Sequence, residues 1–182
     1  WVQISGPLVI EDKLQTKEYT FGIPEGWEGN EISGRVVKKG TDGQCYIQVV
    51  KVATLKGEES LDTYLESVDA QNTAIAEAFA DEEQMNALIE QNPAFATYKG
   101  CKYAIAEDTG MIASASLNCK IRTHKITDKD GKLIHYAENL YFVANKAIYK
   151  LDYICEGGKG YDKSFAFRSY VANNFTFKVK DK

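Results

Sequence analysis

The chain has two histidines, the residues most often used for metal binding and proton transfer near neutral pH. His124 and His135 lie on neighbouring predicted strands, as diagonal neighbours on the more polar face of a sheet. Two imidazoles can begin a metal site. However, Lys120 and Arg122 line the same face, and no carboxylate of these two strands joins them. We therefore expect an ordinary solvated or helix-covered face, and we assign no metal.

Glu138 is the carboxylate best suited to acid–base chemistry. The register derived below places it on the apolar face, between Thr123 and Tyr153. A desolvated carboxyl group has a raised pKa, as catalytic acids do. The alternative, which we favour, is that the hydroxyls of Thr123 and Tyr153 satisfy it, or that it lies at a frayed sheet edge. Glu138 and Tyr153 are thus candidate binding residues, and no residue is assigned as catalytic.

A glycine-rich segment, EGGKGYDKS at residues 156–164, precedes a predicted helix. Such a loop could hold a phosphate at the helix N-terminus. It has neither GxxxxGK[ST] nor GxGxxG spacing, so we expect a connecting loop with left-handed glycines. No Ser/His/Asp or Cys/His set can be argued either, and GxSxG is absent. We expect a protein that is not an enzyme and needs no cofactor.

The chain has four cysteines and no CxxC pair, which argues against zinc ribbons and thioredoxin-like motifs. They are Cys45, Cys101, Cys119 and Cys155. Two disulfides in an oxidising compartment remain open. Each cysteine nevertheless lies in an apolar or aromatic segment, where a free cysteine serves as a small hydrophobic residue. We favour buried free thiols.

The size and composition indicate one globular domain, residues 1–182. Hydrophobic residues make up 44% of the 182, enough for a buried core. The net charge of −4 gives no overall field that favours nucleic acid. Because the chain starts at Trp1, we expect that a signal peptide or lipoprotein leader precedes it in the native protein. This predicts an extracytoplasmic domain, periplasmic or at the cell surface, with a membrane tether if that leader carries a lipid anchor.

The first third of the chain has strand patterns. VQISGPLVI is one predicted strand, and YTFGIPEGW alternates large apolar residues before a proline turn that leads to Trp27. The sequence GTDG separates ISGRVVKK from QCYIQVVKVA and predicts a hairpin. Trp27 is a candidate partner-binding residue if it is exposed and a structural clamp if it is buried.

Helices are predicted in the middle and near the end. Ser60 should cap a helix over SLDTYLESVDA. The segment from Thr73 to Gln91 should form two short helices, because Asp81 and Gln84 have the spacing of a capping box. Near the end, KSFAFRSYVAN predicts a helix and NFTFK a closing strand.

From Thr97 to Cys155 the chain predicts a four-stranded antiparallel meander. Its expected turns are Asp108–Gly110, a type I′ turn at Asp130–Gly131, and Asn145–Lys146. The resulting cross-strand pairs are Tyr103–Ala115, Cys101–Leu117, Cys119–Phe142, Ile121–Leu140, Phe142–Tyr149, Leu140–Leu151 and Tyr136–Cys155. Apolar positions thus face one another, and a slip by one residue would bring charged residues opposite them. Cys101 and Cys119 become diagonal neighbours, poorly placed for a disulfide.

The order of these elements resembles the Mog1/PsbP-like fold family, which includes the PsbP protein of oxygenic photosynthesis and many bacterial envelope lipoprotein domains. YTFGIPEGW looks like the opening strand and P-x-x-W turn of the family, and QCYIQVVKV with SLDTYLESV looks like its strand-to-helix step. KIRTHKITDKDGKLIHYAENLYFVANKAIYKLDYIC looks like its long hairpins, and FRSYVANNFTFK is similar to its closing helix and strand. The resemblance covers residues 17–179, after an N-terminal extension at 1–16. A helical insertion at 73–93 departs from the family pattern.

The resemblance implies an α+β fold in which helices pack on the faces of an antiparallel sheet, an α/β/α sandwich. It also implies a small, non-enzymatic protein of the cell envelope that binds other proteins. No site residue is carried over, because no matching site motif is present. Our first functional hypothesis is therefore an extracytoplasmic protein-binding or assembly module. The alternative is a small-ligand-binding protein or hydrolase that uses Glu138 in a pocket between the sheet and the insertion helices. The oligomeric state is left open.

Overall fold

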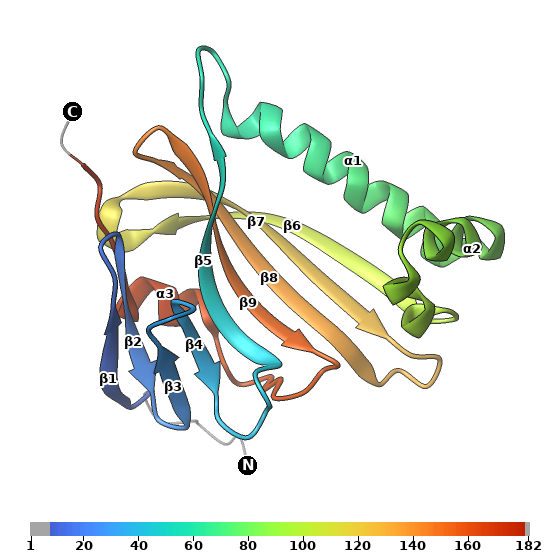
Figure 1. Ribbon diagram of the computed structural model, residues 1–182, viewed down its shortest axis with the longest axis horizontal. Coiled ribbons are helices and arrows are strands. Elements are labelled where there is room, and N and C mark those ends of the chain that lie inside the picture. The colour runs from blue at the N-terminus through green and yellow to red at the C-terminus, as the bar shows by residue number, and fades with distance from the viewer. Residues whose placement is uncertain (1–7, 181–182) are drawn as a thin grey trace.

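The computed structural model describes residues 8–180 and shows three layers (Figure 1). The central layer is a seven-stranded antiparallel sheet. Helix α1 (Leu61–Ala80) covers one face of it, with helix α2 (Glu82–Gln91) packed against α1, and helix α3 (Phe167–Asn174) and a three-stranded sheet cover the other face. This confirms the α+β class with helices on the sheet faces. Among the described residues, no helix is both long and apolar enough to cross a membrane.

The strands of the large sheet are, in spatial order, β3 (Trp27–Asn30), β4 (Arg35–Lys38), β5 (Cys45–Thr54), β9 (Ala147–Glu156), β8 (Leu133–Ala144), β7 (Leu117–Thr127) and β6 (Lys102–Ile112). The small sheet contains β1 (Ile10–Gln15), β2 (Tyr19–Pro24) and β10 (Phe175–Phe177), in that order. Two short 3₁₀ turns complete the described elements, η1 (Pro93–Tyr98) and η2 (Ala113–Ala115).

The predicted register of β7, β8 and β9 is confirmed. The observed pairs include Cys119–Phe142, Ile121–Leu140, Phe142–Tyr149, Leu140–Leu151 and Tyr136–Cys155. Asn145 and Lys146 have φ values of 51° and 57°, the left-handed pair that a type I′ turn requires. The predicted hairpin at GTDG also forms, because β4 pairs with β5 across it. Matching the apolar face was therefore sufficient to set the register of these strands.

The first hairpin of the meander turns later than predicted. Strand β6 continues past Gly110, and the chain turns through η2 to Ser116, which has a left-handed φ of 52°. Gly110 instead pairs with Cys119, and a side-chain carbon there would lie 3.1 Å from Cδ1 of Ile121. The glycine thus allows a close packing contact rather than a turn. Cys101 and Cys119 lie at opposite ends of this hairpin, so their predicted proximity is wrong.

The turn at Asp130–Gly131 is also of another type. Only Gly131 has a positive φ, 82°, and its amide donates to the carbonyl of Asp128 at 3.0 Å. The Asp128 carboxylate accepts hydrogen bonds from the amides of Asp130 and Lys132, both at 2.9 Å. This favours a type I turn followed by a left-handed glycine. An irregularity between Ile126 and Thr127 absorbs the difference, so the register beyond it is unchanged.

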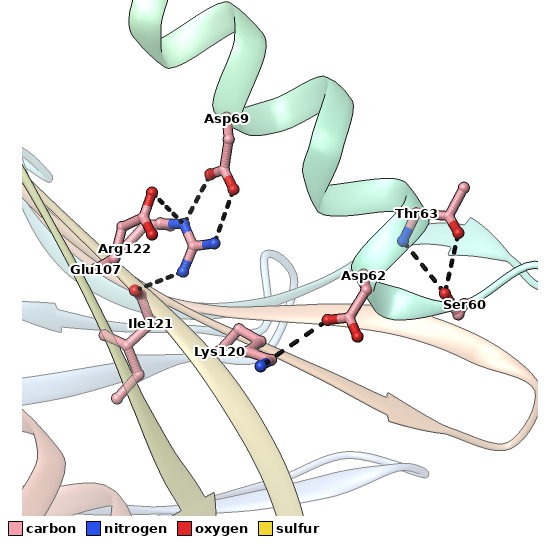
Figure 2. A network of polar contacts seen from close by, with 8 residues as sticks. All are labelled: Ser60, Asp62, Thr63, Asp69, Glu107, Lys120, Ile121 and Arg122. Carbon is pink, nitrogen blue, oxygen red and sulfur yellow. Dashed lines mark hydrogen bonds and ion pairs between the residues drawn. The ribbon is translucent and has the colours of Figure 1, made fainter.

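Helix α1 is longer than predicted and is anchored to the sheet (Figure 2). It begins at the predicted Ser60 cap and continues to Ala80, and Asp81 caps α2 by accepting from the Gln84 amide at 2.9 Å. Two hydrogen bonds, 2.8 and 2.9 Å long, join the Asp69 carboxylate to the guanidinium of Arg122 in β7. This paired contact aligns α1 with the meander.

The main core lies between the large sheet and the layer formed by α3 and the small sheet. Its fully buried residues include Phe21, Phe142 and Phe175. Strand β1 falls within the predicted N-terminal extension, and its Leu14 is buried in this core. Most of the strand predicted over VQISGPLVI lies outside the described residues.

Candidate functional site

The three sequence-predicted site residues lie on the same face of the large sheet. Tyr153 in β9 is directly opposite Glu138 in β8, as predicted. The ring centroid of Trp27, at the start of β3, is 6.4 Å from that of Tyr153. Phe165 joins the two aromatic residues, at 5.4 Å from Trp27 and 5.1 Å from Tyr153. The fold thus brings distant segments together into one aromatic cluster.

Trp27 is only 6% exposed and lies in the main core, which favours the structural clamp of the two alternatives, and it also borders a surface groove of about 580 Å³. The groove runs along α3, from Ser169 to Asn174 at its C-terminal end. The aromatic residues that line it are Trp27, Phe165 and Tyr170, and polar side chains surround them. The polar residues are Glu25, Lys38, Asp162, Ser164, Ser169, Asn173 and Asn174. We call this feature the Trp27 groove.

Polar groups of the Trp27 groove are held by the surrounding structure. The Lys38 ammonium donates to the carbonyl of Gly160 at 2.7 Å. Asp162 accepts from the hydroxyl of Ser164 at 2.7 Å and from its amide at 2.9 Å, which lowers the pKa of the Asp162 carboxyl. The hydroxyl of Tyr170 donates to a backbone carbonyl of β2 at 2.6 Å, and burial raises its pKa. Lys38, Asp162 and Tyr170 are therefore ordered by the surrounding fold before anything binds.

Glu138 is buried in an ion pair that the sequence did not reveal. Its carboxylate accepts from Arg168 of α3 at 2.7 Å and from the hydroxyl of Tyr136 at 3.2 Å. The expected hydroxyl partners, Thr123 and Tyr153, make no hydrogen bond with it in the described residues. Helix α3 covers the face opposite to α1 and α2. The predicted pocket between the sheet and the insertion helices therefore does not reach Glu138.

Tyr153 is the least exposed of the three, at 1%. Its buried hydroxyl has no hydrogen-bond partner within residues 8–180, and burial raises its pKa. An unpaired buried hydroxyl costs stability. Of the three site residues, Tyr153 is the one whose buried polar group is left without a partner among the described residues.

Comparison with known proteins rests on the solved structures, since no family model and no curated protein matches the chain. The chain is similar to the solution structure of cyanobacterial PsbP (CyanoP) from Synechocystis sp. PCC 6803. The identity is 10%, the match covers 97% of this chain and 99% of that chain, and the TM-score is 0.54. The fold is PsbP-like. This confirms the resemblance in fold, and at this identity it concerns the fold alone.

The histidine face of this PsbP-like sheet is covered by helices. Nδ1 of His124 lies 2.6 Å from the hydroxyl of Tyr103, whose ring packs on Phe79 of α1. Burial lowers the pKa of His124 to about 4 and also lowers that of His135. The ring of Tyr98 packs against His135. The described residues contain no cluster of three metal-ligating side chains.

Sequence reasoning did not find the α3 side of the groove. Asp162 lies in the expected connecting loop, Ser164 at the junction of that loop with the helix predicted over KSFAFRSYVAN, and Ser169 within that helix. The available signal was the aromatic spacing of Phe165 and Tyr170 directly after the glycine-rich segment. In this chain, the stretch folds back against the Pro24–Trp27 corner, so that the two segments border one groove.

Proposed function

We propose that this chain is a non-enzymatic binding or assembly module that receives a protein segment in the Trp27 groove. The observation that carries the proposal is a groove lined by aromatic residues, with a polar rim in which Lys38, Asp162 and Ser164 are already held by intramolecular hydrogen bonds. Aromatic residues are enriched at protein interfaces, and a preformed surface lowers the entropy cost of binding.

The extracytoplasmic location is part of this proposal. It is supported by the PsbP-like fold, since the resemblance associates such domains with the cell envelope. Protease treatment of intact cells and spheroplasts that express the native open reading frame would test it. Protection in both preparations would contradict an extracytoplasmic location.

A second candidate is a small amphipathic ligand in the same groove. The volume of about 580 Å³ falls within the range of small-molecule sites. A hydrolase that uses Glu138 is not supported, because Arg168 and Tyr136 occupy its carboxylate.

Site-specific photocrosslinking in the native host separates these candidates. A photoreactive residue would replace Ser169, which is exposed and lines the groove, or Ala172, which is exposed on the same helix but does not line it. We expect one discrete protein adduct from position 169 and none from position 172. Introducing Ser164→Arg should abolish that adduct by filling the groove.

Equal labelling at both positions, or no protein adduct at position 169, would contradict the proposal. Native mass spectrometry of the protein purified from its host provides the second readout. A bound small molecule that is lost in Ser164→Arg, without a protein adduct, would support the small-ligand alternative.

A further inference from the structure

Two cysteines distant in sequence face each other in the large sheet. Cys45 of β5 is directly opposite Cys155 of β9, and their Sγ atoms are 3.3 Å apart. Both residues are fully buried. The Glu156 amide donates to the carbonyl of Gln44 at 2.8 Å, which places the cysteines at a non-hydrogen-bonded position of the ladder. Side chains are closest at such positions.

The backbone at this position suits a cross-strand disulfide. Non-hydrogen-bonded partners have Cα atoms roughly 4.5 Å apart, and disulfides join Cα atoms about 4.4–6.8 Å apart. The two sulfurs, now 3.3 Å apart, need to approach to the roughly 2.05 Å of a disulfide bond. The other two cysteines lack such a partner, since Cys119 is opposite Gly110 and Cys101 precedes β6.

We propose that Cys45 and Cys155 are a redox modification site, oxidised to a disulfide that ties β5 to β9. The oxidant is another disulfide, either that of a thiol–disulfide oxidoreductase or the oxidised form of a low-molecular-weight thiol. The Cys155 thiolate attacks it, forms a mixed disulfide and releases one thiol. The Cys45 thiolate then attacks Sγ of Cys155 and releases the second. The two cysteines lose two protons and two electrons, and the oxidant gains them as two thiols.

The interaction between the two thiols favours Cys155 as the first nucleophile. A hydrogen bond from Cys45 lowers the pKa of Cys155 despite its burial. The hydrogen bond with Cys155 and burial both raise the pKa of Cys45. A thiolate reacts with disulfides far faster than a thiol does.

The glycine-rich segment covers this pair. Gly160 has a left-handed φ of 75°, and a side-chain carbon there would lie 2.8 Å from Cβ of Cys45. The segment is anchored by the bond from Lys38 to the Gly160 carbonyl and by the Lys159–Asp42 ion pair at 2.6 Å. The disulfide therefore forms after β5 and β9 have paired but while this segment is displaced, and is afterwards shielded from reductants.

Formation of this disulfide needs no binding partner, so the purified chain is sufficient for the test. The reduced, unfolded chain would be refolded in a buffer of reduced and oxidised glutathione, then denatured and alkylated. Peptide mapping should show Cys45 linked to Cys155, with Cys101 and Cys119 alkylated. Alkylation of both Cys45 and Cys155, or a link of either to another cysteine or to glutathione, would overturn the proposal.

Thermal unfolding provides a second measurement. Oxidised wild type should melt about 10 °C above reduced wild type, because the link joins residues 110 positions apart. Cys119→Ala, also at a buried cysteine, should keep this difference, and Cys45→Ala should lose it. If Cys45→Ala does not fold, the melting temperatures of the oxidised and reduced forms are compared for wild type and for Cys119→Ala, and both should show the difference. Equal melting temperatures for oxidised and reduced wild type would contradict a stabilising link.

Discussion

At the residue scale, the ionisable side chains of the large sheet are held by partners from other elements. Glu138 meets Arg168 of α3, and His124 meets Tyr103 of β6. Asp152 is fully buried and accepts from Gln48 and Asn139, while burial raises its pKa. The predicted register assigned Glu138 and His124 to the correct faces. It could not supply the partner from α3, because strand register says nothing of which helix packs on a face.

His124 should make stability depend on pH. Burial lowers its folded-state pKa to about 4, against about 6.5 when unfolded. Between these values the unfolded chain binds a proton that the folded chain does not, so stability falls as pH decreases through this window. We expect a loss of about 2 kcal/mol between pH 7 and pH 5, measured by urea unfolding.

The matched variant is His124→Gln, which should lose less stability than wild type over the same pH interval. An NMR titration that gave His124 an ordinary pKa near 6.5 would contradict this assignment.

At the element scale, α1 depends on one buried cation for its alignment with the sheet. Figure 2 shows the Arg122 guanidinium between Asp69 of α1 and Glu107 of β6. The side chain of Arg122 is 8% exposed, and its other contact is a backbone carbonyl of β7. Nearer the start of α1, Asp62 and Lys120 form a second, exposed ion pair at 3.9 Å. The two pairs differ in burial, so they should differ in energy.

Asp69→Ala should destabilise the protein by about 3 kcal/mol, because it leaves the Arg122 charge buried without its main partner. Asp62→Ala is the matched control and should cost less than about 0.5 kcal/mol. Urea unfolding measures both, and amide hydrogen exchange should show α1 opening in Asp69→Ala. Equal costs for the two variants would mean that the buried pair does not anchor the helix.

At the scale of the whole molecule, the two ends of the chain build the layer opposite α1 and α2. Strand β10 pairs with β2, and the ring centroid of Phe175 lies 5.0 Å from that of Phe21. Phe177 of β10 packs against Phe142 of the large sheet, at 5.2 Å. The closing strand therefore joins the small sheet to the central layer.

Phe175→Ala should reduce the free energy of unfolding by about 3–5 kcal/mol, through lost burial and the cavity left behind. Thr176 lies between the two phenylalanines but is exposed, so Thr176→Ala should change stability by less than about 0.5 kcal/mol. Chemical denaturation of both variants tests this. A small effect of Phe175→Ala would indicate that the small sheet contributes little to the core.

Turn chemistry explains where sequence prediction succeeded and failed. Asn145 and Lys146 were placed correctly, because apolar residues at fixed distances on both sides allowed one register. Gly110 was misplaced, because a glycine that permits a close contact and a glycine that permits a turn look alike in sequence. Of the site residues, Tyr153 and Glu138 were paired correctly, but the α3 side of the Trp27 groove was not foreseen.

The sequence by itself determined the α+β class, the caps of α1 and α2, and the register of β7, β8 and β9. Each of these follows from local propensity or from side-chain alternation along neighbouring segments. Only the tertiary structure decided that Trp27 borders a groove with α3, that Arg168 neutralises Glu138, and that Cys45 faces Cys155. The shortest of these contacts, Arg168–Glu138, joins residues 30 positions apart, and no local pattern encodes how distant segments pack against each other.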